Sequence, residues 1–174
     1  MKLVNLKVIM YVSPSNKTQR IPEEFFSSYR ENTKNIILAA SSIENLLAEG
    51  IIRYFFGNNI SKRNILNNLV ISSDSFTFSS KRKAFLSIVR EQKIISNAEV
   101  NKLEKLLAKT IRYRNLFTHG KAVFSESGCV LRYFEGEKRE LVLDDEFLNK
   151  VEGEMNSCFD KIDELKGKIS EVVP

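Results

Sequence analysis

Apolar residues recur at three- and four-residue spacing along most of the chain, which predicts a mainly helical protein. The clearest run ends near Arg114, and its apolar side chains fall on one face of a helix: Val100, Leu103, Leu106, Leu107 and Ile111. Ser96-Asn97-Ala98-Glu99 matches a capping box and predicts the start of this helix. The helical pattern stops at Gly120.

Four further segments read as helices. The first begins at Pro22, runs to Phe56 and is stopped by Gly57-Asn58-Asn59, and its length would allow a bend near Asn32-Thr33. Its second half carries an apolar stripe of Ile37, Ala40, Ala48, Ile51 and Phe55.

A short helix is expected over Ser61–Ile71. Another is expected after a cap at Ser79 or Ser80, with Phe85, Ile88 and Val89 inward. The last helix is capped by Asp144, with Leu143 and Leu148 as a hydrophobic staple.

Short extended segments follow Gly120, at Ala122–Ser125, Cys129–Phe134 and Lys138–Leu143, separated by turn residues. They predict a three-stranded meander, which a strand at Leu3–Val12 could join. The expected fold is therefore mainly α: a bundle of four main helices with a small antiparallel β-meander before the C-terminal helix. We expect one domain, with an extended N-terminal segment (1–21), a helical core (22–120), the meander (121–143) and a C-terminal helix (144–170).

Arg114 is the unusual residue of the patterned helix. On an ideal helical wheel it projects only ~20° from Leu103, so it continues the apolar stripe. A guanidinium in that position is costly unless it is paired or opens onto a cleft. Glu44 lies in the apolar stripe of the first helix and is the preferred partner for Arg114. The alternative is that Glu44 reaches solvent at an edge of the bundle.

His119, the only histidine of the chain, lies five residues after Arg114, and Asn115 lies four residues before His119. Asn115 and His119 share a helix face, whereas Arg114 and His119 are roughly 140° apart. Arg114 and His119 could meet through the length of the arginine, through fraying before Gly120 or across a symmetry axis. An arginine, an amide and an imidazole together suit a phosphodiester. The alternative is an ion-paired core arginine beside a histidine that caps helix carbonyls.

Composition adds a mild preference for anionic partners, since the 174 residues carry a net charge of +5 and a pI near 9.2. Lys81-Arg82-Lys83 form a basic cluster that is either a solvated face or a contact for a nucleic-acid backbone. Arg112 and Lys121, on either side of the Arg114–His119 stretch, are further candidates for RNA contact.

Several classes of protein are disfavoured by what the sequence lacks. Two cysteines make no disulfide framework, and a single histidine without Cys-x-x-Cys makes a zinc site unexpected. The chain has no phosphate-binding glycine-rich loop, no Gly-x-Ser-x-Gly and no His-Glu-x-x-His. No cofactor or metal is expected. With no stretch of ~20 apolar residues, we expect a cytoplasmic protein without membrane contact.

Arg114-Asn115-x-x-x-His119, at the end of a helix in a helical context, resembles the R-polar-x3-5-H motif of the HEPN superfamily. The stretch from Phe78 to Gly120 is similar to the mannitol operon repressor-like branch, with a Phe-Ser-x-Lys helix start and a helix ending in Arg-Asn-x-Phe-x-His. Thr118 departs from that branch, where an alanine is common. The resemblance covers about the middle half of the chain.

The resemblance implies a metal-independent endoribonuclease that cleaves RNA by attack of the ribose 2′-hydroxyl. Arg114, Asn115 and His119 would be its catalytic residues and Glu44 a supporting one. It also implies a homodimer with a composite site, an antitoxin or regulatory partner, and a toxin–antitoxin or phage-defence context. The alternative is a non-catalytic interaction or regulatory module, because some members of the superfamily are regarded as regulators.

Overall fold

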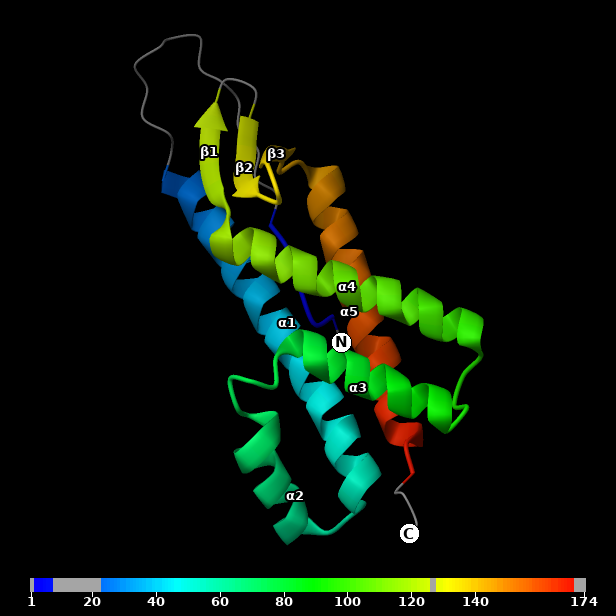
Figure 1. The fold of residues 1–174 in the computed structure, drawn as a ribbon. Helices are drawn as coiled ribbons and strands as arrows, with labels where there is room; N and C mark the ends of the chain where they lie inside the picture. Colours follow the sequence, from blue (N-terminus) through cyan, green and yellow to red (C-terminus); the bar gives the residue numbers. More distant parts are fainter. Residues whose placement is uncertain (1, 8–22, 126–127, 171–174) are drawn as a thin grey trace. The chain divides into compact units, whose positions relative to one another are not determined.

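The computed structural model describes residues 2–7, 23–125 and 128–170, and these form helices and one small sheet (Figure 1). The elements in chain order are α1 (Glu23–Phe56), α2 (Ile60–Leu66), the π-helical turn η1 (Asn67–Ile71), α3 (Phe78–Glu91), α4 (Asn97–His119), β1 (Lys121–Ser125), β2 (Gly128–Phe134), β3 (Lys138–Val142) and α5 (Asp145–Lys168). The predicted fold class is confirmed: a mainly helical chain carries a three-stranded antiparallel meander before its C-terminal helix.

Local capping signals set several of the helix boundaries. At α4 the amide of Ser96 donates to the Glu99 carboxylate at 2.9 Å, and the Glu99 amide donates to the Ser96 hydroxyl at 3.3 Å. Asp144 accepts from the amide of Phe147 at 2.8 Å before α5. Both predicted caps are confirmed. The prediction for α3 was wrong by two or three residues, because the capping hydroxyl belongs to Thr77, which accepts from the Ser80 amide.

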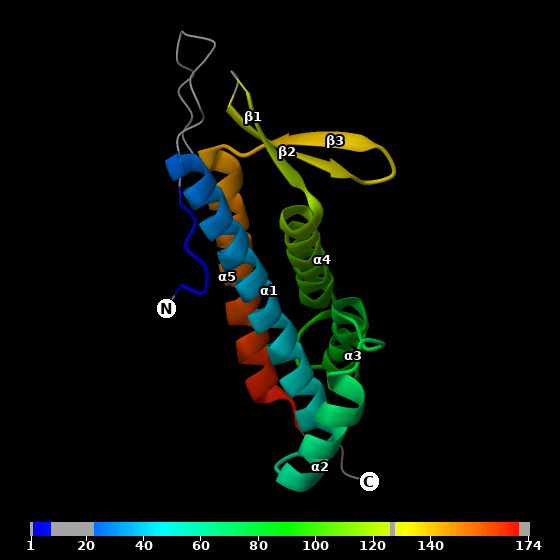
Figure 2. The ribbon, with the colours of Figure 1, turned by 90° about the vertical axis from the view of Figure 1, so that its left-hand side faces the viewer.

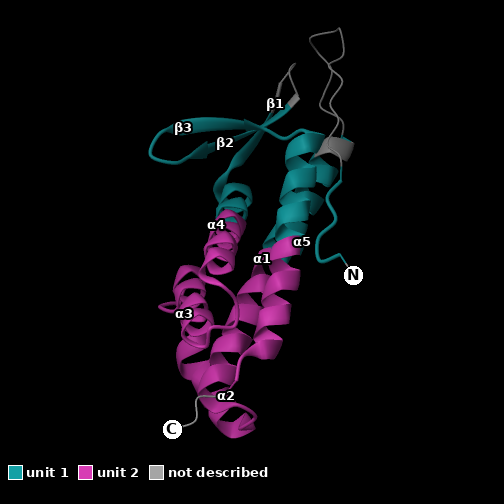
Figure 3. Ribbon diagram, turned by 90° about the vertical axis from the view of Figure 1, so that its right-hand side faces the viewer, with its two compact units in different colours: residues 1–39, 112–156 teal, residues 40–111, 157–174 magenta. Residues whose placement is uncertain are grey.

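The chain divides into two compact units, coloured in Figure 3. Unit 1 contains Met1–Ala39 and Arg112–Asn156, and unit 2 contains Ala40–Ile111 and Ser157–Pro174. The boundary falls within helices, since α1, α4 and α5 each begin in one unit and end in the other.

The sheet of unit 1 has the strand order β1-β2-β3, which Figure 2 shows from the side. Lys121 of β1 is opposite Arg132 of β2, and Val130 of β2 is opposite Val142 of β3. Cys129 and Leu131 are buried. The predicted turn at Glu135-Gly136-Glu137 joins β2 to β3, with Gly136 at φ 75°, whereas the turn between β1 and β2 includes residues 126–127 and lies outside the described ranges.

The N-terminal segment of unit 1 is held by side chains rather than by a strand partner. Asn156 accepts from the amides of Leu3 and Val4 at 2.7 and 3.0 Å, and its own amide donates to the carbonyl of Val4 at 3.1 Å. The buried Asn32 accepts from the amide of Lys7 and donates to its carbonyl, both at 2.7 Å. Residues 3–7 are therefore not the predicted strand, because these side chains satisfy their backbone; residues 8–12 of that prediction lie outside the described ranges.

The core of unit 2 is built on aliphatic side chains together with the aromatic rings of Tyr54, Phe78 and Phe85. Phe85 of α3 is fully buried, as are Leu47 of α1 and Leu107 of α4. Gly50 of α1 permits this packing, because a Cβ at that position would lie 2.5 Å from the ring of Phe85. The predicted inward face of α3 is confirmed, since Ile88 and Val89 are also buried.

The predicted stripe of α1 is confirmed at Ala40, Ala48 and Ile51, which are buried, and is wrong at Ile37 and Phe55. Ile36, Ile43 and Leu47 are completely buried, whereas Phe55 is exposed and Ile37 only partly covered. Two overlapping apolar stripes are available on this helix, and packing against other elements decides which one faces inward.

Part of α1, Phe26–Phe56, is the only helix of the described residues that is long and apolar enough to cross a membrane. Its apolar composition exceeds what the sequence analysis expected. However, 56% of its most apolar window is buried inside the structure. A core helix has the same composition, so length and composition here are weak evidence for a membrane span.

Candidate functional site

The stretch Arg114–Gly120 forms the end of α4 and lies in unit 1. The helix continues through His119, so fraying before Gly120 does not bring Arg114 and His119 together. Glycine is required directly after the helix, because a Cβ at Gly120 would overlap the carbonyl oxygen of Leu116 and lie 2.8 Å from the Leu131 side chain. The amide of Gly120 still donates to Leu116 at 2.8 Å.

The position of Arg114 corrects the helical-wheel prediction. The buried stripe of α4 continues through Thr110, Tyr113 and Phe117, and Arg114 is half-buried beside it. Arg114 therefore flanks the core instead of occupying its centre. Asn115 and His119, four residues apart, are both exposed.

Tyr113, directly before Arg114, is a residue that the sequence analysis did not single out. Its hydroxyl donates to the carboxylate of Glu154 at 2.5 Å, and its ring meets the edge of Phe147 at a centroid distance of 6.0 Å. Burial is the main reason that the pKa of Tyr113 lies well above its ordinary value, and the hydrogen bond to Glu154 raises the pKa further. The three- and four-residue spacing from Leu103 through Leu107 and Thr110 could have identified Tyr113 as the inward residue.

Arg112, a predicted candidate for RNA contact, is bound within unit 1. Its guanidinium donates to both carboxylate oxygens of Glu135, at 3.3 and 3.2 Å, and to the hydroxyl of Tyr133 at 3.2 Å. The bond to Glu135 raises the pKa of Arg112. Arg112 is thus used to hold the β2–β3 hairpin against the end of α4. Lys121, the other predicted contact in this unit, is exposed at the start of β1.

Arg114, Asn115 and His119 differ from Arg112 and Tyr113, which are bonded within the fold. In the described part of the chain, none of the three side chains makes a hydrogen bond or an ion pair. One helix end therefore presents a cation, an amide and an imidazole that are not used by the fold. Such groups are available to a ligand or to a second protein chain.

Glu44 was expected to pair with Arg114, but its observed partner is Lys81. Both residues belong to unit 2, and Lys81 donates to the carboxylate of Glu44 at 2.6 Å. The two side chains are only 12% and 21% exposed. Lys81 is consequently neither a solvated residue nor an open contact for RNA. In the same cluster Lys83 is exposed, while Arg82 is partly covered and its Nε is buried without a hydrogen-bond partner.

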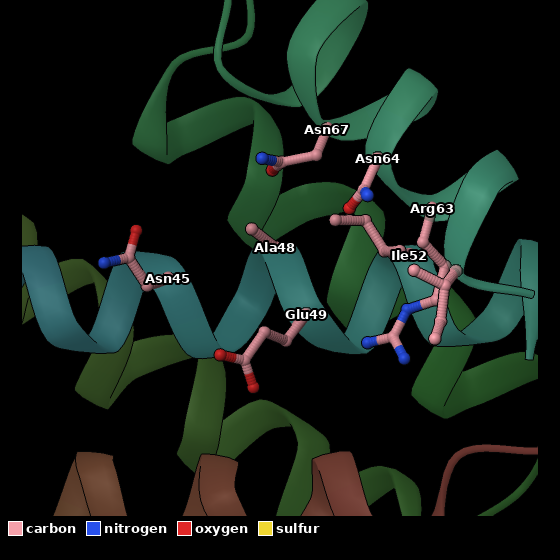
Figure 4. A pocket seen from close by; sticks show the side chains of 8 residues that line it. Asn45, Ala48, Glu49, Ile52, Arg63, Asn64 and Asn67 are labelled. Carbon is pink, nitrogen blue, oxygen red and sulfur yellow. The ribbon is translucent and has the colours of Figure 1, made fainter. Parts of the chain in front are cut away.

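A polar pocket that the sequence did not predict lies in unit 2 between α1 and the α2–η1 segment (Figure 4). It has a volume of about 430 Å³, within the range of small-molecule sites. Its lining contains three asparagine amides, a guanidinium and a carboxylate: Asn45, Asn64, Asn67, Arg63 and Glu49. Glu49 is already paired with Lys166 at 2.9 Å. The pocket lacks aromatic side chains and a nucleophile, so its lining indicates no particular reaction.

Within the described ranges, no group of three or more histidine, cysteine, aspartate or glutamate side chains could hold a metal ion. Comparisons with protein-family models, curated proteins and solved structures give no match for this chain. The chemistry of the Arg114–His119 stretch must therefore be argued from its own residues.

Proposed function

We propose that the chain is a metal-independent endoribonuclease of HEPN type, with Arg114, Asn115 and His119 as its site. The observation that carries the proposal is that neighbouring polar side chains at the end of α4 differ in their hydrogen bonding. Arg112 and Tyr113 are bonded to Glu135 and Glu154, whereas the three motif side chains have no partner among the described residues. A fold that binds Arg112 and Tyr113 here leaves these three for an external ligand.

The three groups suit cleavage of RNA by its own 2′-hydroxyl. The hydroxyl oxygen would attack the adjacent phosphorus and lose its proton to an imidazole, the side chain that exchanges protons near neutral pH. The bond from phosphorus to the 5′-oxygen would break, and that oxygen would take up a proton. Arg114 would stabilise the charge on the phosphoryl oxygens, and Asn115 would orient the substrate or His119.

This reaction uses two proton carriers, and each chain has one histidine. A two-fold dimer with two α4 ends at its axis supplies the second imidazole by symmetry. Because His119 is helical and about 140° around α4 from Arg114, a second copy would also bring an arginine to each histidine from another direction. We therefore propose a homodimer, which sedimentation at tens of micromolar should detect (~10⁻⁵ M is well above typical dissociation constants of stable interfaces).

The test is cleavage of mixed RNA without metal, with His119→Ala and Arg114→Lys beside the wild type. Arg114→Lys keeps the charge and loses the planar contact, so we expect a loss of about 10²-fold or more. Arg139→Lys is the matched control, because Arg139 is an exposed arginine of the same unit that pairs with Glu137. Unchanged cleavage by well-folded Arg114→Lys protein would refute the catalytic role.

A non-catalytic interaction module is the second candidate, and the single histidine favours it. In that function Arg114, Asn115 and His119 would bind an antitoxin-like or regulatory protein rather than RNA. Wild-type protein without cleavage activity that still dimerises through α4 would support this alternative. In that case His119→Ala would weaken the dimer and change no RNA product.

A further inference from the structure

The α2–η1 segment of unit 2 exposes an unusual amount of apolar side chain. None of the seven residues of α2 is buried, and only Ile71 of η1 is buried. Ile60 and Leu69 are 71% and 73% exposed, and Ile65 and Val70 are also exposed, as is Phe55 at the end of α1. Large apolar patches on a soluble surface mark contacts with a partner or a membrane. We name these five residues the apolar tip.

Three cations lie in the same stretch of the chain as the apolar tip. Residues 50–73 contain Arg53, Lys62 and Arg63 and no carboxylate. None of the three makes an ion pair in the part of the chain that the structure describes. Lys62 also lines a purely apolar slot of about 170 Å³ together with Phe56, Ile65, Leu66, Leu69 and Val70. The occupant of this surface is therefore both apolar and anionic.

We propose that the apolar tip is a peripheral membrane contact that binds anionic lipid surfaces. Its aliphatic side chains and Phe55 enter the boundary between headgroups and acyl chains, and the cations remain at the level of the anionic headgroups. Acyl chains are fluid and can fill the shallow slot. Membrane contact was not expected from the sequence, and the exposure of this segment is the observation that changes the expectation. The proposal is independent of the proposed ribonuclease.

Two other occupants fit the observations less well. A helix bound in a groove needs a single apolar stripe, whereas Ile60 and Ile65, five residues apart in α2, project about 140° apart. A second copy of the chain would place two sets of unpaired cations against each other across a two-fold axis. A lipid surface accommodates several side-chain directions and supplies the opposite charge.

The experiment is co-sedimentation of the full chain with vesicles of phosphatidylcholine containing about one third phosphatidylserine, compared with phosphatidylcholine alone. We expect at least about fivefold stronger binding to the anionic vesicles, and weaker binding as salt is added. The double variant Ile65→Asp, Leu69→Asp should bind the anionic vesicles at least about tenfold more weakly than the wild type. Both positions are exposed, so the variant should melt near the wild-type temperature.

Phe134→Asp is the matched control, because Phe134 is 76% exposed at the end of β2 in the other unit. It should bind within about twofold of the wild type. No binding by wild type, equal binding to both vesicles, or equal loss in both variants would overturn the proposal. Concentration-dependent self-association that Ile65→Asp, Leu69→Asp abolishes, without vesicle binding, would assign the apolar tip to a second copy and would also overturn it.

Discussion

Lys81 donates to Glu44 at 2.6 Å, and this largely buried ion pair joins α3 to α1 within unit 2. Removing one partner of such a pair leaves a charge without compensation in a poorly solvated place. The pair explains why a lysine is tolerated in the first turn of α3, where the helix dipole disfavours positive charge.

Lys81→Met, which keeps the aliphatic stem, should therefore destabilise the protein by about 2 kcal/mol, since the pair is partly rather than fully buried. Urea denaturation measures the change. Lys83→Met is the control on the same helix, because Lys83 is exposed, and its effect should stay within about 0.5 kcal/mol. Equal effects of the two substitutions would show that the ion pair contributes nothing to stability.

The attachment of the N-terminal segment should depend on pH through Glu152. Burial tends to raise the pKa of this carboxyl, but bonds from Lys2 at 2.7 Å and from the amide of Leu6 at 2.9 Å outweigh it, so the pKa is lowered from 4.5. A lowered pKa in the folded state means that the ionised carboxylate stabilises the fold. This contribution is complete above pH 4.5 and disappears as the pH falls through the folded-state value.

Denaturation of wild type and Glu152→Gln as a function of pH checks this expectation. The wild type should be more stable by about 1–2 kcal/mol near neutral pH, and the difference should shrink below the ordinary carboxyl range. A difference that is constant across the acid range would show that Glu152 acts by its shape rather than its charge.

Gly120→Ala should destabilise the protein, because the new methyl group would overlap the Leu116 carbonyl and press on Leu131. We expect a loss of about 1–3 kcal/mol, measured by thermal unfolding. Gly153→Ala is the control and should change the stability in the opposite direction. Gly153 is within α5 with open space around it, so alanine there should stabilise by about 0.5–1 kcal/mol through helix propensity.

Both cysteines should resist thiol reagents in the folded protein. Cys129 and Cys158 are buried and free, and burial raises the pKa of each thiol to about 11. The reactive thiolate fraction near neutral pH is then about 100-fold lower than for an ordinary thiol, and access is blocked as well. Labelling with a disulfide reagent should be slow until denaturant is added, whereupon both thiols react. Fast labelling of either cysteine under native conditions would contradict the burial described for it.

The sequence alone determined the elements that depend on neighbouring residues. The Ser96–Glu99 box, the Asp144 cap and the Glu135–Glu137 turn between β2 and β3 act through bonds a few residues apart, and all three were found where expected. The Arg114, Asn115 and His119 motif was also visible in the sequence. Its exposed amide and imidazole follow from a four-residue spacing on the outer face of α4.

Only the tertiary structure decided which of several compatible partners each residue uses. Glu44 was expected to pair with Arg114 or to reach solvent, and packing placed Lys81 beside it instead. Arg114 and Tyr113 are adjacent in the sequence and roughly 100° apart on the wheel. The ring of Tyr113 is buried, whereas Arg114 lies at the margin of the core. Residues 3–7 have strand-like composition, but Asn156 and Asn32 satisfy their backbone instead of a neighbouring strand. Long-range contacts determine these partners. Helical periodicity and composition indicate the apolar face of a helix, but they do not specify which element packs against that face.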